Sequence, residues 1–523
     1  MKKILLSLMV LAALASCSGG DNDPRLVIIT FDGLRWQEVF TGADSLLVGN
    51  PKYAADSEGL KAAYWRSTPE ERRQALMPFI WSYAPENGFL VGNRTKGSQM
   101  QVANSKKYSY PGYSEMFCGY ADDERVASND PVPNPNKSVL EVANEDPRYK
   151  DKVMMYASWE SIRYAVNNER GGFPGSVAYE PNVARTPTPV LQLIDEMQEG
   201  MFHYWGSERF DAFTYAYALE TLKNDHPKVM YVGFGDTDEF AHAKKYDWYL
   251  SAANYCDKYI RRIVETCESD PFYKGKTTYL LLCDHGRGYG RNFDGHGSGN
   301  RGSENTWFIA FGKGVEKLGE TSDNGPFYNQ QLAATIAKVL GIDFTPDNGV
   351  KQEPINPHYK GEPLVDVIPQ TEFGTFQAVS ASPKGKGVRY TYHEGEVKSV
   401  EELAGLPVLQ SGVLPDFLID GAKVDEYFGF QYKALVRIDE TGRYHFLCGS
   451  DDGSKVWLDG QQIIDNDGSH GSNTEEAFFT LEKGYHRLEV KYFQKTEGKT
   501  LKLWWETPEG EEVPLSKDIL YYE

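Results

Sequence analysis

Four continuous apolar runs, each followed at once by a polar turn, constrain the fold of this chain most strongly. The runs are Leu26–Phe31, Val229–Phe234, Thr278–Cys283 and Trp307–Phe311. Such runs are typical of strands buried on both faces, as in a parallel sheet. Between them, apolar residues recur at three-and-four spacing from Tyr249 to Cys267 and from Gln330 to Leu340, which predicts helices. This alternation predicts a doubly wound, mainly parallel α/β domain, which binds ligands beyond the carboxyl ends of its strands.

The pattern changes after residue 365. Residues 366–386 are rich in Pro, Gly, Ser and Thr and are predicted to form a linker. Beyond them, short alternating runs are separated by Gly and Asp turns, which predicts an antiparallel β-sandwich over residues 387–523. A chain of 523 residues is too long for one ordinary core. Two main domains are therefore expected, at 24–365 and 387–523.

The first 17 residues combine Lys2 and Lys3 with a short apolar run and end in Leu14-Ala15-Ser16-Cys17. The run is too short to span a bilayer and is typical of an export signal. Its end resembles a bacterial lipobox, which implies cleavage before Cys17 and lipid attachment to that residue. Residues 18–23 would then be a tether. The resemblance implies an exported protein anchored to a bacterial membrane, at the periplasmic side of the outer membrane or at the cell surface; a plain secretory signal is the alternative.

Charge and cysteine content narrow the classes of partner. Lys and Arg number 55 against 75 Asp and Glu, a formal net charge of -20, so no nucleic-acid-binding surface is expected. Small anionic substrates stay open, because bound metal ions reverse the charge locally. The five cysteines after Cys17 are scattered and predict buried small side chains rather than a disulfide framework, although one disulfide is left open.

A set of acidic and imidazole side chains follows the predicted strands. The set comprises Asp32, Asp238, His242, Asp284, His285 and His296. Each has an ordinary interpretation alone, such as a helix cap for Asp32 or a surface loop for His296. The spacing of four between Asp238 and His242 places both on one side of a helix. Together, carboxylates and imidazoles suit zinc, and Ser109 offers a hydroxyl nucleophile.

These motifs resemble those of the alkaline phosphatase superfamily, and most closely its nucleotide pyrophosphatase/phosphodiesterase branch. The matching motifs are Asp32-Gly-Leu-Arg35, Ser109 before Tyr-Pro, Asp238-x-x-x-His242, Asp284-His285-Gly and His296-Gly. The resemblance implies that Asp238, His242 and His296 hold one zinc ion. It implies that Asp32, Asp284 and His285 hold another, together with the Ser109 oxygen; Mn²⁺ is the alternative metal. On a looser match, it also implies that Asn129 touches a phosphoryl oxygen, with an Asn in a turn as the alternative.

The resemblance implies a two-zinc phosphodiesterase that acts through a phosphoseryl intermediate on Ser109. One ion would activate the hydroxyl and the other would bind the leaving oxygen. A Lys-x-Arg pair that some monoesterases carry is missing from Ala157–Arg163, which favours a diester. No Arg follows in Ser109–Tyr113, which disfavours a formylglycine sulfatase. A phosphomonoesterase or sulfohydrolase on the same site, or a carbohydrate-binding lipoprotein without activity, are the alternatives.

The C-terminal region resembles the anthrax protective-antigen-type (PA14) β-sandwich. The matching segments are Gly449–Gly460, Ile464–Gly468 and Gly484–Glu489. The resemblance implies that Asp451 and Asp452 hold Ca²⁺ against a carbohydrate, so the substrate would be a phosphate ester linked to a glycan. A hairpin turn formed by Asp-Asp-Gly is the alternative.

Overall fold

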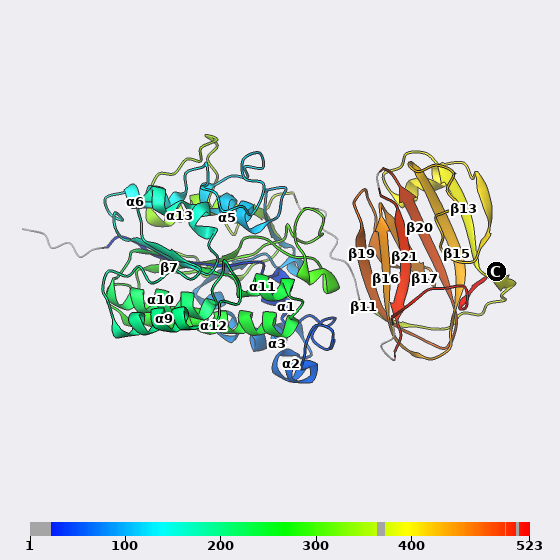
Figure 1. The fold of residues 1–523 in the computed structure, drawn as a ribbon, viewed down its shortest axis with the longest axis horizontal. Helices are drawn as coiled ribbons and strands as arrows, with labels where there is room; N and C mark the ends of the chain where they lie inside the picture. The colour runs from blue at the N-terminus through cyan, green and yellow to red at the C-terminus, as the bar shows by residue number, and fades with distance from the viewer. Residues whose placement is uncertain (1–21, 363, 365–371, 497, 509–511) are drawn as a thin grey trace, which may run out of the picture.

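The computed structural model describes residues 22–362, 364, 372–496, 498–508 and 512–523. They form two lobes, an α/β domain and a β-sandwich (Figure 1). The predicted export signal with Cys17, the first part of the tether and residues 366–371 of the predicted linker lie outside the described residues. Among the described helices, none has the length and apolar character needed to cross a bilayer.

An eight-stranded sheet forms the centre of the α/β domain. Its order is β5 (Gly175–Val177), β4 (Val153–Ala157), β6 (Val229–Phe234), β1 (Arg25–Phe31), β7 (Thr277–Cys283), β8 (Phe308–Gly312), β2 (Gly88–Val91) and β9 (Gly319–Glu320). Strands β5 to β7 in this order are parallel, and β1, β6 and β7 are buried along their whole length. The fourth apolar run forms β8, which is antiparallel to β7, because an apolar run reports burial on both faces and not strand direction.

Helices cover both faces of this sheet, so the doubly wound architecture is confirmed (Figure 1). On one face lie α5 (Ser109–Cys118), α6 (Val139–Glu145), α7 (Ile162–Val166), α8 (Asn168–Gly171) and α13 (Gln331–Leu340). On the other lie α1 (Trp36–Thr41), α2 (Ser57–Tyr64), α3 (Pro69–Leu76), α4 (Pro78–Asn87), α9 (Pro189–Gly200), α10 (Asp211–Asn224), α11 (Asp236–His242) and α12 (Tyr246–Ser269). Smaller elements are η1 (Arg94–Lys96), η2 (Gly290–Asp294), and the paired strands β3 (Ser98–Gln101) and β10 (Asn324–Tyr328).

The C-terminal lobe is a sandwich of two mainly antiparallel sheets, as predicted, but it begins earlier in the chain than expected. Two of its strands, at 372–376 and 385–386, lie in the segment that was predicted to be a linker, because their backbones pair with strands of the sandwich. One sheet has the order β11 (Glu372–Phe376), β19 (Asn473–Leu481), β16 (Gly442–Asp451), β21 (Thr500–Glu506) and β22 (Glu512–Pro514). The other contains β12 (Gly385–Lys386), β23 (Leu520–Tyr522), β15 (Phe428–Ile438), β20 (Gly484–Gln494), β17 (Ser454–Leu458) and β18 (Gln461–Asn466). In the same sheet, β13 (Val388–Glu394) pairs with β15, and β14 (Gln410–Leu414) pairs with β13. The short η3 (Val400–Gly405) precedes β14. The five described cysteines are all buried free thiols.

Candidate metal centre and nucleophile

The predicted site residues meet at the carboxyl ends of three neighbouring parallel strands. Asp32 follows β1, α11 follows β6, and Asp284 with His285 follows β7. Because β6, β1 and β7 are adjacent and parallel, these ends lie at the same edge of the sheet. Residues separated by more than 200 positions in the chain are thereby brought together.

One group of ligand atoms comes from α11 and a glycine-rich loop. Asp238, His242 and His296 offer ligand atoms that all lie within 4.8 Å of one another. His242 Nε2 lies 3.0 Å from Asp238 Oδ2 and 3.0 Å from His296 Nε2. This is the set that the resemblance assigned to one metal ion.

The second group differs in one member from the set that the resemblance implied. Asp32, Asp238 and His285 offer ligand atoms within 4.8 Å of one another, so Asp238 belongs to both groups. Asp284 lies beside them, with Oδ2 at 3.5 Å from His285 Nε2. Its Oδ1 accepts the Gly33 N–H at 3.1 Å, whereas Oδ2 is buried without a hydrogen-bond partner among the described residues. A buried carboxylate oxygen without a donor is costly unless a proton or a cation neutralises it, so Asp284 fits a metal site.

Backbone carbonyls orient two of the imidazoles toward the group. The Nδ1 atoms of His285 and His296 lie 2.8 Å from the Gly286 carbonyl and 3.1 Å from the Lys107 carbonyl. Because a carbonyl only accepts, each Nδ1 carries the proton, which leaves each Nε2 with a free lone pair. Metal-bound histidines are held in this way.

The charges of this cluster also fit a cation. Burial, and then the charge of Asp238, raise the pKa of Asp32 to about 8. Burial, and then Asp32, raise the pKa of Asp284 well above its ordinary range. Burial lowers the pKa of His285 to about 4, and burial with His285 nearby lowers the pKa of His296 to about 2. His285 and His296 are therefore neutral, as ligands must be, whereas the charge of Asp238 outweighs burial and raises the pKa of His242. A divalent ion would relieve the repulsion between the carboxylates.

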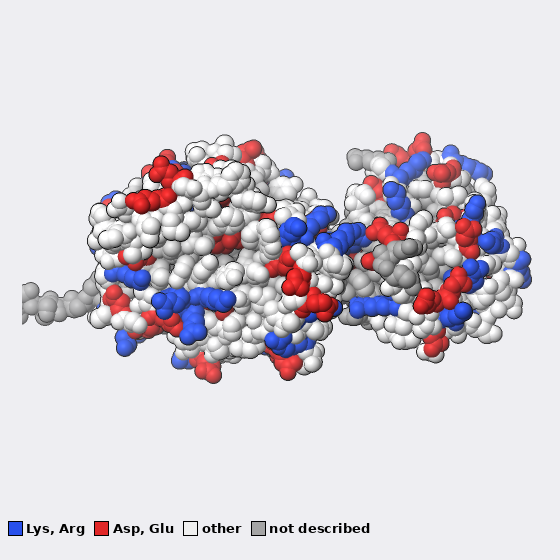
Figure 2. All heavy atoms as spheres, turned by 60° about the horizontal axis from the view of Figure 1, so that its bottom comes forward, with Lys and Arg blue, Asp and Glu red and all other residues white. Residues whose placement is uncertain are grey.

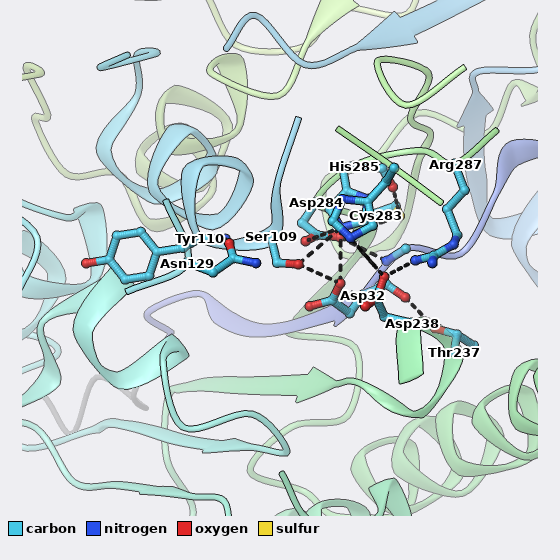
Figure 3. Close-up of polar contacts among 12 residues, drawn as sticks. Asp32, Ser109, Tyr110, Asn129, Thr237, Asp238, Cys283, Asp284, His285 and Arg287 are labelled. Carbon is cyan, nitrogen blue, oxygen red and sulfur yellow. Dashed lines mark hydrogen bonds and ion pairs between the residues drawn. The ribbon is translucent and has the colours of Figure 1, made fainter. Parts of the chain in front are cut away.

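Ser109 lies against the second group. Its Oγ is 3.2 Å from Asp32 Oδ1 and 3.1 Å from His285 Nε2 (Figure 3). It is the first residue of α5, and its side chain points from the helix N-terminus toward the carboxylates. The exposed Asn129 lies beside it: its Oδ1 accepts the Tyr110 N–H at 3.0 Å, and its amide nitrogen is on the side of Ser109 (Figure 3).

Arg287 is a member of the site that the sequence reasoning did not identify. Its guanidinium donates to Asp238 through Nη1 and to the Phe293 and Asp294 carbonyls through Nε and Nη2, both at 2.6 Å. It is almost completely buried. Its position directly after Asp284-His285-Gly286 was the only clue in the sequence, because the residues it binds are fixed by the fold.

The Asp451–Asp452 pair differs from the metal-ligand groups of the α/β domain, because the Asp452 carboxylate already has hydrogen-bond donors. Asp452 is buried and accepts hydrogen bonds from Ser469 Oγ at 2.9 Å, the His470 N–H at 3.1 Å and the Lys495 N–H at 2.7 Å. Neither residue of the pair belongs to a group of described side chains whose ligand atoms converge as a metal would require. Calcium binding here stays a prediction.

Fold and site together define a two-domain protein whose α/β domain contains a candidate two-metal site beside Ser109. This site, called the metal cup below, is formed by Asp32, Asp238, His242, Asp284, His285 and His296. Residues 419–518 match the family model of the PA14 domain, whereas none of the curated proteins compared with the chain matches it. Among solved structures, an alkaline phosphatase superfamily protein from Vibrio parahaemolyticus is 12% identical over 62% of this chain and 69% of its own, with a TM-score of 0.37. A 2-O GAG sulfatase is 13% identical over 62% and 72%, with a TM-score of 0.40. An anti-sigma factor domain-containing protein is 21% identical over 26% of this chain and 48% of its own, with a TM-score of 0.23. This chain therefore spans about half the length of that protein.

Proposed function

We propose that the protein is a metal-dependent hydrolase of phosphoric esters, with Ser109 as nucleophile and diesters as the preferred substrates. The observation that carries the proposal is the position of Ser109 Oγ, within 3.2 Å of both Asp32 and His285. A serine at a helix N-terminus beside convergent carboxylates and imidazoles is suited to attack an anionic ester.

The residues present fit two divalent ions. Asp238, His242 and His296 would hold one, and Asp32, Asp284 and His285 would hold the other, with Asp238 near both. Bound zinc, the ion preferred by mixed imidazole and carboxylate ligands, would act as a Lewis acid for the serine oxygen and the leaving oxygen. Mn²⁺ is the alternative metal.

Ser109 and Asn129 would carry out the parts of the reaction that belong to the protein. The Ser109 oxygen attacks phosphorus as the alcohol leaves, and water then hydrolyses the seryl ester. The Asn129 amide nitrogen, held by the bond from Tyr110 to its own oxygen, is placed to donate to a phosphoryl oxygen. A preorganised donor of this kind stabilises charge that develops in the transition state.

The cationic side chains of Arg287 and Lys107 near the cup are already paired with protein oxygens, which favours substrates with one negative charge over substrates with two. All three nitrogens of Arg287 are bonded to protein oxygens, and Lys107 Nζ pairs with Glu304 at 2.8 Å. A phosphomonoester carries close to two charges near neutral pH, whereas a phosphodiester or a sulfate monoester carries one. Diesters are therefore the first candidate, and sulfate esters are the second.

Three chromogenic esters test the proposal. We expect the purified full chain to hydrolyse bis-p-nitrophenyl phosphate faster than p-nitrophenyl phosphate, and a chelator to stop the reaction. Ser109→Ala should lower kcat by at least about 10³-fold, whereas Ser114→Ala, five residues further along α5, should leave it unchanged. A preference for p-nitrophenyl sulfate would favour a sulfohydrolase, and full activity of Ser109→Ala on all three esters would exclude Ser109 as nucleophile.

A further inference from the structure

The sandwich presents an outer sheet face that is unusually buried. Along β19, Ala477 and Phe479 pack in the sandwich core, while Glu476 and Phe478 alternate with them and point outward. The outer face of a two-sheet sandwich is ordinarily solvated, yet Glu476 and Phe478 are only 6% and 9% exposed. Phe478 belongs to the core cluster of the α/β domain. Figure 1 shows β19 on the side of the sandwich that faces the α/β domain.

The element that covers this face is η2, the turn that leads to His296. The Arg291 N–H donates to Glu476 Oε1 at 2.8 Å, and Asn292 Nδ2 donates to the Thr474 carbonyl at 2.7 Å. The Arg291 guanidinium lies 5.9 Å from the ring of Trp504 on β21. Two strands of the sandwich therefore contact one turn of the α/β domain, and that turn ends two residues before His296.

The shape of the turn is fitted to the Glu476 carboxylate. Gly290 has a φ of 50°, and a Cβ there would lie only 1.8 Å from Glu476 Oε1. The other carboxylate oxygen is 2.8 Å from His445 Nε2, and His445 Nδ1 is 3.3 Å from Glu506. Because carboxylates only accept, both ring nitrogens donate and His445 carries a positive charge. The charged imidazole holds Glu476 in the position that accepts the Arg291 N–H.

The inner side of η2 is connected to the metal cup. Arg287 donates to the carbonyls of Phe293 and Asp294 in η2 and, through Nη1, to Asp238. The turn is thus held from the sandwich by Glu476 and from the cup by Arg287. We propose that the sandwich holds the metal cup in shape: Glu476 and Thr474 are positioning residues for the loop that carries His296. This supporting role is called the brace below.

Two variants of the full chain that each remove one contact between the sandwich and η2, together with one control variant, test the brace. Glu476→Gln removes the charge that pairs with His445, and Asn292→Ala removes the bond to Thr474 from the other side. The control is Asp459→Asn, which neutralises the carboxylate that pairs with His486 at 2.7 Å elsewhere in the sandwich. We expect faster amide hydrogen exchange in residues 287–302 for the first two variants only. Their zinc affinity, measured by competition with a chelating dye, should fall about tenfold, as for other partners that orient metal ligands.

The brace stands apart from the hydrolase proposal, since neither measurement needs turnover; only the role of His296 as a ligand rests on the proposed function. Weakened zinc binding and faster exchange without hydrolysis of any ester would support the brace and reject the activity. Unchanged exchange in residues 287–302 in Asn292→Ala, which alters one half-buried side chain of the α/β domain, would overturn the brace even if Glu476→Gln failed to fold. Equal effects in Asp459→Asn would overturn it as well.

Discussion

The metal cup of the α/β domain and the Asp451–Asp452 turn of the sandwich are both rich in carboxylates, but their oxygens are satisfied differently. In the cup, Asp284 Oδ2 is buried with no donor from the part of the chain that the structure describes, and imidazole Nε2 atoms point toward carboxylates. In the turn, Asp452 accepts three hydrogen bonds from Ser469, His470 and Lys495. The surface charge does not separate the two regions, since Figure 2 shows acidic and basic side chains interspersed over one face of both lobes.

The two regions therefore differ in the supply of hydrogen-bond donors to their carboxylates rather than in the number of acids. Three donors already neutralise much of the charge on Asp452 and tie three segments of the sandwich together. In the cup, Arg287 donates to Asp238, but burial, and then the charge of a neighbouring carboxylate, raises the pKa of Asp32 and of Asp284. A cation would stabilise the cup strongly and would gain little at the turn.

The comparison between cup and turn predicts its largest effect on the amount of metal bound to the purified protein. Asp238 lies in both ligand groups, so Asp238→Asn should remove bound zinc and lower diester turnover by more than about 100-fold, the upper end seen for residues that merely orient ligands. Asp451→Asn makes the same change of charge in the sandwich and should alter neither quantity. Metal analysis of the dialysed proteins and initial rates check both. Two zinc ions retained by Asp238→Asn would contradict the assignment.

A second variant tests whether the amide nitrogen of Asn129, beside the cup, is a hydrogen-bond donor that becomes used only when substrate binds. The Asn129 amide nitrogen faces Ser109, whereas every donor at Asp452 is already used. Asn129→Ala should therefore lower kcat by about 10² to 10³-fold, as for other oxyanion donors, with little change in KM. Ser128→Ala, in the same loop, is the control and should keep full activity. A rise in KM without a loss of kcat would mean that Asn129 contributes to binding only.

Much of the fold was predictable because buried parallel strands leave a simple pattern. The apolar runs before Asp32 and Asp284 form β1 and β7, and the alternation beyond residue 387 forms the sandwich. The meeting of Asp32, Ser109 and His285 was implied by the resemblance to the alkaline phosphatase superfamily and is present in the structure. Their roles as ligands and nucleophile stay predictions.

Other features could not be predicted, since they depend on which segments become neighbours. The contact of Arg287 with Asp238 and the contact of η2 with Glu476 join residues about 50 and 185 positions apart. No local pattern encodes such pairs, and the direction of β8 depends equally on its neighbours. Lipid attachment at Cys17 and a glycan partner for the sandwich also stay predictions.

A smaller effect is expected at the turn itself, on stability. In Asp452→Asn, one acceptor oxygen becomes an amide group that faces a donor, so one charge-assisted bond is lost and the unfolding free energy should fall by about 2 to 3 kcal/mol. Urea unfolding with and without Ca²⁺ measures it, with Asp451→Asn for comparison. Stabilisation of the wild type by millimolar Ca²⁺, abolished in both variants, would show that the turn is a calcium site after all and would break the comparison.

The smallest effect concerns Glu475, a buried sandwich carboxylate that accepts a hydrogen bond from Asn473 Nδ2 at 3.1 Å. Burial outweighs this bond and the nearby charge of Arg301, and raises its pKa to about 7. The folded state therefore binds more protons than the unfolded state between about pH 4.5 and 7. Stability falls as pH rises through this window, by on the order of 1 kcal/mol for each pH unit.

Glu475→Gln should remove this dependence, so that the variant gains stability relative to the wild type between pH 5 and pH 8. The difference between the two urea midpoints measures the gain, because all other groups titrate in both proteins. Glu512→Gln, at an exposed position of β22, is the control and should follow the wild type. Parallel curves for Glu475→Gln and the wild type would mean that burial does not raise the pKa of Glu475. The contrast between cup and turn would then need a cause other than donor supply.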